Sequence, residues 1–446
     1  MRQLPPVYQT LLILASTVFL ICWLGCASNT TRTLMPTPIG IVAGLPYPGH
    51  DSSDFQTVED VPVFILSGRN VHEDKDRLNP FGNGRSRNPK LGIAYVKIGD
   101  GLSAKELREE TLTNRSKKTA NVSFSHVKLT PSLADFDPWR VKDDNVRHQD
   151  SDWVQALRKQ LDESKRRHVV VFVHGYNTEL IENTLLAAEI FHYLGRDGAM
   201  ISFEWPSHAR LLGYVADKGN AMYSTRQLRA LLSNISKECD ADSVTILAHS
   251  AGSPIVVNAL REIRLLDFDM TPEEIREKYR INRVVLAAPD MDTMAFINAV
   301  HDRFHEVAGR VAVYASPEDK ALELSEWLTG SQRLGNSVGD LQEWESNVLS
   351  NVAEIEMVDA SVAEKMYATF LGHGYFHRDP WVSSDIGAFI LGQEPLQRGL
   401  KKEEGQVFWK FPKDFPDRLG RIAAERSTTR WAKEETSAED TEMKLK

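Results

Sequence analysis

Cysteine is scarce in this sequence, with three residues among 446. Three cysteines cannot form the disulfide framework that stabilises small secreted scaffolds. Positive charge is not concentrated either: 53 Lys and Arg residues stand against 62 Asp and Glu residues, which gives a net charge of −9. A chain without a basic stripe lacks the surface that binds phosphate backbones, so nucleic acid is not expected as a partner.

The motifs of several cofactor-dependent enzymes are also missing. No Gly-rich loop precedes a Lys-Ser or Lys-Thr pair, and there is no dinucleotide-binding fingerprint. Two His pairs, His301/His305 and His373/His377, have helical spacing, but neither belongs to a His-Glu-x-x-His motif or lies near a cysteine cluster. We therefore expect neither a cofactor nor a metal site.

The first 26 residues have the pattern of an export signal. The run Leu11–Leu24 is apolar apart from two hydroxyl residues. It is shorter than the roughly 20 residues of a transmembrane helix and fits the apolar region of a signal peptide. Its end, Trp23-Leu24-Gly25-Cys26, resembles a bacterial lipobox, in which Cys26 is lipidated. An uncleaved N-terminal membrane anchor and ordinary secretion are the alternatives. All three place the body outside the cytoplasmic membrane, and the two anchored forms predict a location in the bacterial cell envelope.

The composition divides the remaining chain into four segments. They are a flexible tether (27–58), an N-terminal extension of the core (59–150), the regular core (151–395) and a C-terminal extension (396–446). The N-terminal extension holds two expected strands, at 61–66 and 91–98, and little structure is expected over 100–150. The charged tail after about residue 425 is expected to be disordered.

Strands and helices alternate from residue 151 onward. The strands are short apolar runs, expected at 169–173, 199–205, 243–248, 284–288, 311–315 and 352–358. The helices are expected at 179–194, 219–237, 252–265, 292–307 and 380–391. Strands that are apolar throughout are buried on both faces, as in parallel sheets. The pattern therefore predicts an α/β fold, a mostly parallel sheet with helices on both faces.

One strand of this core leads into a motif that places a serine at a sharp turn. The pentapeptide Ala248-His249-Ser250-Ala251-Gly252 lies between an expected strand and an expected helix. Small residues two before and two after the serine allow the strand and helix backbones to approach, and the serine then stands at the carboxyl edge of the sheet. Ser250 is therefore the candidate nucleophile.

A nucleophilic serine also needs an oxyanion hole, which is a pair of N–H donors for the negatively charged oxygen of the intermediate. The residue after the nucleophile, Ala251, supplies the first candidate. The stretch Val173-His174-Gly175-Tyr176-Asn177 follows the first buried strand, and the Tyr176 N–H is the second candidate.

The serine needs a histidine base, which an acid must orient, in the chain order serine, acid, histidine. Asp319 lies just past the second strand after the serine and is the preferred acid; Asp290 and Asp292, one strand earlier, are the alternatives. His373, flanked by glycines that form a loop, is the preferred base, with His377 as its rival.

Several stretches together resemble a known family, the bacterial alpha/beta-hydrolases that are catalogued as a domain of unknown function. They are Val-Phe-Val-His-Gly-Tyr-Asn-Thr (171–178), Phe-Glu-Trp-Pro-Ser (203–207), Leu-Ala-His-Ser-Ala-Gly (247–252), Leu-Ala-Ala-Pro-Asp-Met-Asp (286–292), Tyr-Ala-Ser-Pro-Glu-Asp-Lys-Ala-Leu (314–322) and His-Gly-Tyr-Phe (373–376). The resemblance covers roughly residues 60–395. It implies an alpha/beta-hydrolase fold with a triad at Ser250, Asp319 and His373, but no substrate.

The expected function is hydrolysis of carboxylic esters of small molecules through an acyl-enzyme, without a cofactor. An amidase, peptidase or acyltransferase with the same triad is the alternative among enzymes, and a non-catalytic cell-envelope scaffold is the alternative outside them. About twenty residues separate the strands at 284–288 and 311–315, so no large lid is expected there and only the segment 327–350 is available as a cover.

Overall fold

The computed structural model describes residues 30–45, 60–72, 78–113, 120–130, 151–207, 214–361 and 372–426. The predicted export signal at 1–26 and most of the predicted disordered tail lie outside these ranges, so both stay predictions. Among the described helices, none combines the length and apolar character that crossing a bilayer requires.

An eleven-stranded sheet runs through the molecule in the order β1-β4-β3-β2-β6-β5-β7-β8-β9-β10-β11. Seven strands from β6 to β11 are mutually parallel, β2 is parallel to β6, and β3, β4 and β1 continue the sheet antiparallel. The strands are β1 (Thr31–Thr33), β2 (Val61–Val71), β3 (Phe81–Ile98), β4 (Asn121–Leu129), β5 (His168–Val173), β6 (Ala199–Glu204), β7 (Ser243–His249), β8 (Ile281–Ala287), β9 (Arg310–Ala315), β10 (Ile355–Asp359) and β11 (Phe408–Lys410).

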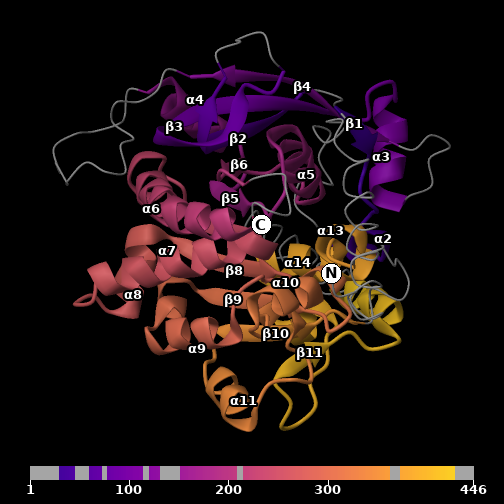
Figure 1. The fold of residues 1–446 in the computed structure, drawn as a ribbon. Coiled ribbons are helices and arrows are strands. Elements are labelled where there is room, and N and C mark those ends of the chain that lie inside the picture. The colour runs from indigo at the N-terminus through magenta and orange to yellow at the C-terminus, as the bar shows by residue number, and fades with distance from the viewer. Residues whose placement is uncertain are drawn as a thin grey trace, which may run out of the picture.

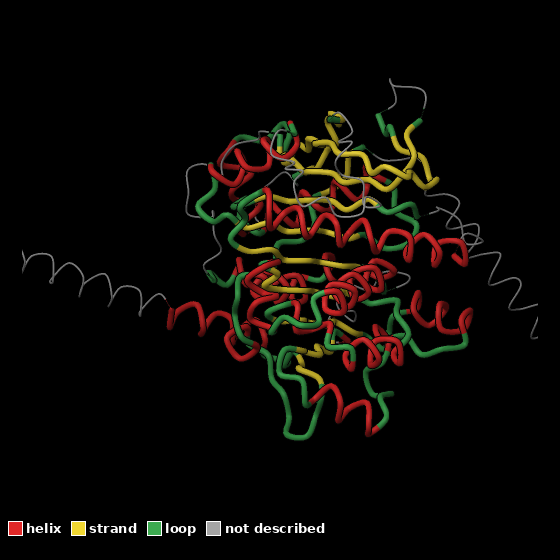
Figure 2. The backbone as a smooth tube through the Cα atoms, turned by 90° about the vertical axis from the view of Figure 1, so that its left-hand side faces the viewer, coloured by secondary structure: helices red, strands yellow, loops and turns green. Residues whose placement is uncertain are grey.

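Helices cover both faces of the sheet, as Figure 1 shows with α6 to α9 on the left and α5, α13 and α14 on the right. In Figure 2 the strands run across the molecule behind a layer of helices. The helices are α2 (Ile39–Val42), α3 (Ala104–Thr113), α4 (Asp152–Asp162), α5 (Leu180–Tyr193), α6 (Tyr214–Glu238), α7 (Ser253–Leu266), α8 (Pro272–Tyr279), α9 (Thr293–His301), α10 (Lys320–Thr329), α11 (Glu343–Ser350), α13 (Tyr375–Arg378) and α14 (Pro380–Ile390). The predicted α/β fold is confirmed.

Strand β5 shows why the central strands are apolar throughout. Val169, Val171 and Val173 pack into the core beneath α4, α6 and α7. Val170 and Phe172 pack into the second core, beneath α5 and α14. Successive side chains of a strand point to opposite faces, so a strand between two helical layers needs an apolar residue at every position.

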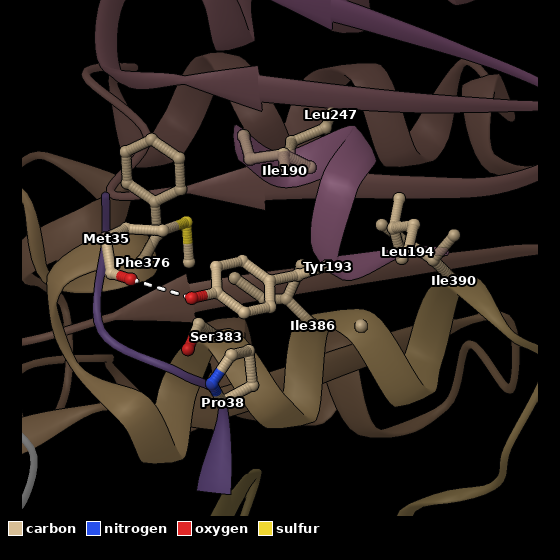
Figure 3. Close-up of a pocket in the computed structure, with 11 residues that line it drawn as sticks. Met35, Pro38, Ile190, Tyr193, Leu194, Leu247, Phe376, Ser383, Ile386 and Ile390 are labelled. Carbon is tan, nitrogen blue, oxygen red and sulfur yellow. Dashed lines mark hydrogen bonds between the residues drawn. The ribbon is translucent and has the colours of Figure 1, made fainter. Parts of the chain in front are cut away.

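The expectation of a flexible tether over 27–58 does not hold for residues 30–45. Figure 3 shows Met35 and Pro38 beside Tyr193 of α5 and Ser383 of α14. The Tyr193 hydroxyl donates to the Met35 carbonyl at 3.0 Å, and Leu34, Ile41 and Leu45 of the same segment are also buried. These apolar residues are too few and too irregularly spaced to produce a periodic signal, so only their contacts with α5 and α14 reveal that the segment packs.

Sequence patterns also underestimated the structure of the N-terminal extension. Both expected strands are longer in the structure, because β2 extends to Val71 and β3 begins at Phe81. These two residues pair with each other. The stretch 100–150, for which little structure was expected, contains α3 and β4. The polar helix α3 buries Leu107 and Thr111, and only alternate residues of β4 such as Val122 and Phe124 are buried. Elements with so few buried residues have weak hydrophobic patterns.

Replacing Arg32 with Ala is expected to destabilise the protein through Glu189 of α5. Arg32 forms an ion pair with Glu189, and the Met35 N–H donates to the same carboxyl at 2.9 Å. The Glu189 side chain is 1% exposed, so the variant leaves a buried carboxylate without its cation, at a cost of about 1–3 kcal/mol in the free energy of unfolding at pH 7.

This deficit is expected to shrink as the pH falls. Burial, opposed by the Arg32 charge, raises the pKa of Glu189, so this carboxyl takes up a proton more readily in the folded than in the unfolded chain. Below pH 7, as the raised pKa is approached, the variant loses the buried charge and regains stability relative to wild type. Urea unfolding at several pH values measures this, and in a Glu189→Gln background the deficit should be small and independent of pH.

Candidate active site

Ser250 lies at the apex of a strained turn between β7 and α7. The strand ends at His249, a single 3-10 turn covers Ser250–Gly252, and α7 follows. The Ser250 backbone has a φ of 52°, a conformation that costs a non-glycine residue on the order of 1–3 kcal/mol and often marks a functional position. The strand, turn and helix that the sequence predicts around Ser250 are all present.

Two glycines allow the neighbouring backbones to approach this turn. A Cβ atom on Gly252 would lie 2.6 Å from the carbonyl oxygens of both Val173 and His174, at the end of β5. A Cβ atom on Gly175 would lie 3.0 Å from the Cβ of Ser250 and 2.9 Å from Nδ1 of His249. The turn that follows β5 is therefore packed directly against the serine.

Gly252→Ala is expected to destabilise the protein by about 1–3 kcal/mol, because its methyl group meets backbone carbonyls that cannot rotate away. Gly420, in the helix over 415–426, is a matched control, since a Cβ atom added there would have no other atom within 4 Å. Gly420→Ala is expected to be neutral or to stabilise the protein by up to about 1 kcal/mol. Urea unfolding compares the two, and equal stability of both variants would contradict the packing described.

Asp319 and His373, 54 residues apart, are in hydrogen-bond contact. The His373 Nδ1 donates to Asp319 Oδ2 at 2.7 Å, and the Asp319 side chain is fully buried while that of His373 is 21% exposed. The other carboxylate oxygen, Oδ1, accepts from the N–H groups of Ala321 and Leu322 at 3.1 Å, so Asp319 also caps α10. The helix N-terminus thereby fixes the orientation of the carboxylate and favours its negative charge.

The alternative acids have other partners. Asp290 accepts from the Ser325 hydroxyl at 2.6 Å and lies 3.7 Å from the Arg333 guanidinium. Asp292 caps α9 through the Ala295 N–H. The carboxylate that accepts the hydrogen bond of His373 Nδ1 is that of Asp319.

His377, the alternative base, lies in the short helix α13. Its ring packs edge-to-face on Phe376, with centroids 4.6 Å apart, and its Nε2 lies 3.4 Å from the Arg378 Nε. Burial and the Arg378 charge lower the pKa of His377 well below its usual range.

His249 connects the serine turn to the loop of His373. Its Nε2–H donates to the His373 carbonyl at 3.1 Å, and the two rings are 4.8 Å apart between centroids. Burial is the main cause that lowers the pKa of His249 well below its usual range, so the ring is neutral and carries one N–H. The side chain next to Ser250 thus contacts the backbone of the residue that binds Asp319.

The turn after β5 carries Tyr176, and both of its flanks are held. Before it, the indole N–H of Trp205 donates to the His174 carbonyl at 2.8 Å. After it, the Asn177 N–H donates to the Ser207 hydroxyl at 2.9 Å. Asn177 has a φ of 56°, so this turn also has a left-handed residue. Gly175 packs against Ser250. Tyr176 follows Gly175 and Ala251 follows Ser250, so the two candidate oxyanion donors lie next to this contact.

Trp205 itself packs and does not line an open pocket. Its side chain is 0% exposed and stacks on the His174 ring at 5.3 Å between centroids. Burial, reinforced by the charge of Arg69, lowers the pKa of His174 to about 3, so this imidazole is neutral. Trp205 is therefore part of the packed core beside the turn that carries Tyr176.

Neither Arg69 nor the contact made by His249 is indicated by the sequence patterns considered above. Arg69 precedes the core segment 151–395 in the sequence by about 80 residues, and it belongs to no motif whose spacing includes Ser250. The position of His249, directly before Ser250 in the pentapeptide 248–252, is a sequence signal that it lies at the site. Its contact with the His373 loop, 124 residues away, could not be read from a local pattern.

An apolar cavity lies on the α5 and α14 face of the sheet (Figure 3), lined by residues such as Leu247, Phe376 and Ile386. Its volume is about 30 Å³. Ser250, Asp319 and His373 are not among its lining residues, so we do not assign it to substrate.

Comparison with known proteins supports the fold. A family model described as "alpha/beta hydrolase of unknown function (DUF900)" matches residues 149–392. The protein "Uncharacterized protein alr1448" from Nostoc sp. is 24% identical over 175 residues, covering 31% of this chain and 46% of that protein. The chain thus spans less than half the length of this curated relative.

Solved structures of esterase B from Lactobacillus rhamnosis are distantly similar. One covers 49% of this chain and 71% of its own, at 14% identity and a TM-score of 0.29. A second, described as inhibited with a C4-C4 SN3 tributyrin phosphonate, covers 62% of this chain and 80% of its own, at 12% identity and a TM-score of 0.27. Scores this low carry no information about substrate or mechanism.

Proposed function

This chain belongs to the alpha/beta hydrolases of unknown function, and we propose that it is a serine hydrolase that cleaves carboxylic ester bonds of small molecules. Ser250 is the proposed nucleophile, His373 the base and Asp319 the acid that orients it. Export to the cell envelope and membrane anchoring through Cys26 or an N-terminal helix are part of the proposal.

The observation that carries this proposal is the hydrogen bond from His373 Nδ1 to the buried carboxylate of Asp319. A carboxylate at Nδ1 selects the tautomer whose Nε2 can accept a proton, and it stabilises the imidazolium that then forms. The strained conformation of Ser250 and the contact of His249 with the His373 loop support the same assignment.

In the proposed reaction His373 takes the proton of Ser250 as the serine oxygen attacks the ester carbonyl. The N–H groups of Tyr176 and Ala251 stabilise the oxyanion of the tetrahedral intermediate. Proton return from His373 releases the alcohol and leaves an acyl-serine. Water, deprotonated by the same imidazole, then releases the acid and restores the enzyme.

Hydrolysis of p-nitrophenyl esters with acyl chains of two to twelve carbons, beside the matching p-nitroanilides, tests the bond that is cleaved. We expect ester turnover that exceeds anilide turnover for the same acyl group. The reverse order would favour an amidase or peptidase, and transfer of the acyl group to an added alcohol in preference to water would favour an acyltransferase. Lack of turnover together with lack of fluorophosphonate labelling would contradict a serine hydrolase and favour a scaffold.

A further inference from the structure

Arg69 is a buried arginine on β2, outside the residues 149–392 that the family model covers. Its side chain is 2% exposed, and β2 changes register on both sides of it. A guanidinium removed from water must be compensated by hydrogen bonds and opposite charge, so its partners define what the residue does.

The hydrogen bonds of Arg69 lead to the turn that carries Tyr176 and to the segment after β6 that contacts this turn. Its Nη2 donates to the Thr178 carbonyl at 2.7 Å, and its Nη1 donates to the Ser207 carbonyl at 3.1 Å. Thr178 belongs to the turn after β5 that carries Tyr176, and Ser207 belongs to the segment that follows β6. The Ser207 hydroxyl in turn accepts from the Asn177 N–H. The Arg69 guanidinium therefore holds Thr178 directly and Asn177 through Ser207.

The charge of Arg69 is compensated by Glu204, the last residue of β6. Arg69 Nε lies 3.9 Å from Glu204 Oε2, and both side chains are buried. The Ser202 hydroxyl donates to the other carboxylate oxygen at 2.7 Å, and the Asn183 side-chain amide donates to it as well. Burial lowers the pKa of Arg69 and raises that of Glu204, while each charge opposes the shift of the other.

His174, which opens the turn that carries Tyr176, also lies next to this ion pair. The His174 Nε2 lies 3.4 Å from Arg69 Nη2 and 3.6 Å from Glu204 Oε2, and its Nδ1–H donates to the Gly175 carbonyl at 2.7 Å. The ion pair therefore contacts the turn before Tyr176 through His174 and after it through Thr178.

We propose that Arg69 is a positioning residue of the hydrolase, which holds the turn His174–Thr178 so that the Tyr176 N–H faces the oxyanion. This inference rests on the proposed function. It assigns part of the active-site support to the N-terminal extension, so that residues 149–392 by themselves form an incomplete catalytic unit. Arg69 does not touch substrate; it acts through the backbone of the turn.

Arg69→Lys in the full chain tests the proposal, because Lys keeps the charge beside Glu204 but cannot reach both carbonyls with a rigid fork. Loss of one oxyanion donor lowers kcat by about 10²- to 10³-fold. We expect a fall of kcat for p-nitrophenyl butyrate of about this size, with KM within about threefold. Arg69→Met combined with Glu204→Gln, which removes both charges, should have a similarly low kcat, since the carbonyls of Thr178 and Ser207 still lack their donor.

Arg398 offers a matched control for the general effect of altering a buried arginine. It is fully buried, is paired with Glu356 and Asp385, and belongs to the 3-10 turn Pro395–Arg398. Arg398→Lys should lower the unfolding midpoint at least as much as Arg69→Lys and leave kcat within about threefold of wild type. Equal losses of kcat in the two variants, or wild-type kcat in Arg69→Lys, would overturn the proposal.

A second measurement does not depend on activity. Hydrogen–deuterium exchange of the peptide that contains residues 174–178 should be faster in Arg69→Lys than in wild type, with unchanged exchange in β7 and β8. If wild type neither labels nor hydrolyses esters, the proposed function fails, and the exchange still decides whether Arg69 holds the turn. Unchanged exchange at residues 174–178 overturns the proposed positioning role of Arg69, whereas faster exchange confined to this turn supports it.

Discussion

Ser250→Ala is expected to abolish labelling of the full-length protein by a fluorophosphonate probe and to lower kcat for ester hydrolysis by about 10⁴-fold or more. The probe reacts with serines whose hydroxyl is activated by a neighbouring base, and removal of the oxygen eliminates both the reaction and the acyl-enzyme. Removal of a triad nucleophile costs on the order of this factor or more in serine hydrolases, because the remaining groups act only with it. Mass spectrometry of the labelled protein locates the modified peptide.

Ser253 provides the matched control three residues further along. It is as buried as Ser250, at 0% against 4% exposure, and it is the first residue of α7. Ser253→Ala should therefore be labelled at the wild-type rate. Persistent labelling of Ser250→Ala at another serine would contradict the assignment of the nucleophile, provided that circular dichroism shows the variant to be folded.

Asp319→Asn is expected to lower kcat by about 10⁴-fold with little loss of stability. An Asn side chain caps a helix about as well as Asp, so the N–H groups of Ala321 and Leu322 keep their acceptor. At His373, however, the amide no longer selects the Nδ1–H tautomer or stabilises an imidazolium, which is the loss that costs this factor in a serine–histidine–aspartate triad. Steady-state kinetics and urea unfolding separate the two effects.

The alternative acids supply the comparison. Asp290→Asn removes the charge beside Arg333, and Asp292→Asn keeps the cap of α9. Each is expected to retain kcat within about tenfold of wild type, since the carboxylate that accepts the hydrogen bond of His373 Nδ1 is that of Asp319. A larger loss in Asp290→Asn or Asp292→Asn than in Asp319→Asn would show that the acid lies one strand earlier and would contradict the hydrogen bond as the basis of the mechanism.

The core strands and the serine turn could be predicted because their signals are local. In β5 every residue from Val169 to Val173 is apolar, which burial between two helical layers requires. Around Ser250, the small residue Gly252 marks the close approach of α7 to the end of β5. Such patterns are confined to a few consecutive residues, and they arise from backbone sterics and from burial on both faces.

Segments that owe their structure to distant partners could not be predicted in this way. Residues 30–45 have the composition of a tether but pack through Met35 and its neighbours against α5 and α14. Arg69 carries no motif, and its role follows from contacts with Thr178 and Ser207, 109 and 138 residues away. In both cases the partner lies more than 100 residues away along the chain.

By itself, then, the sequence determined the alternation of strands and helices, the parallel core and the candidates Ser250, Asp319 and His373, along with their rivals. Only the tertiary structure decided that the carboxylate in contact with His373 is that of Asp319, that His249 joins the serine turn to the His373 loop, and that Arg69 of β2 contacts the turn that carries Tyr176. The reason is geometric: loops that follow separate parallel strands meet at one edge of the sheet, and which side chains touch there depends on how the strands are ordered and packed, not on their spacing along the chain.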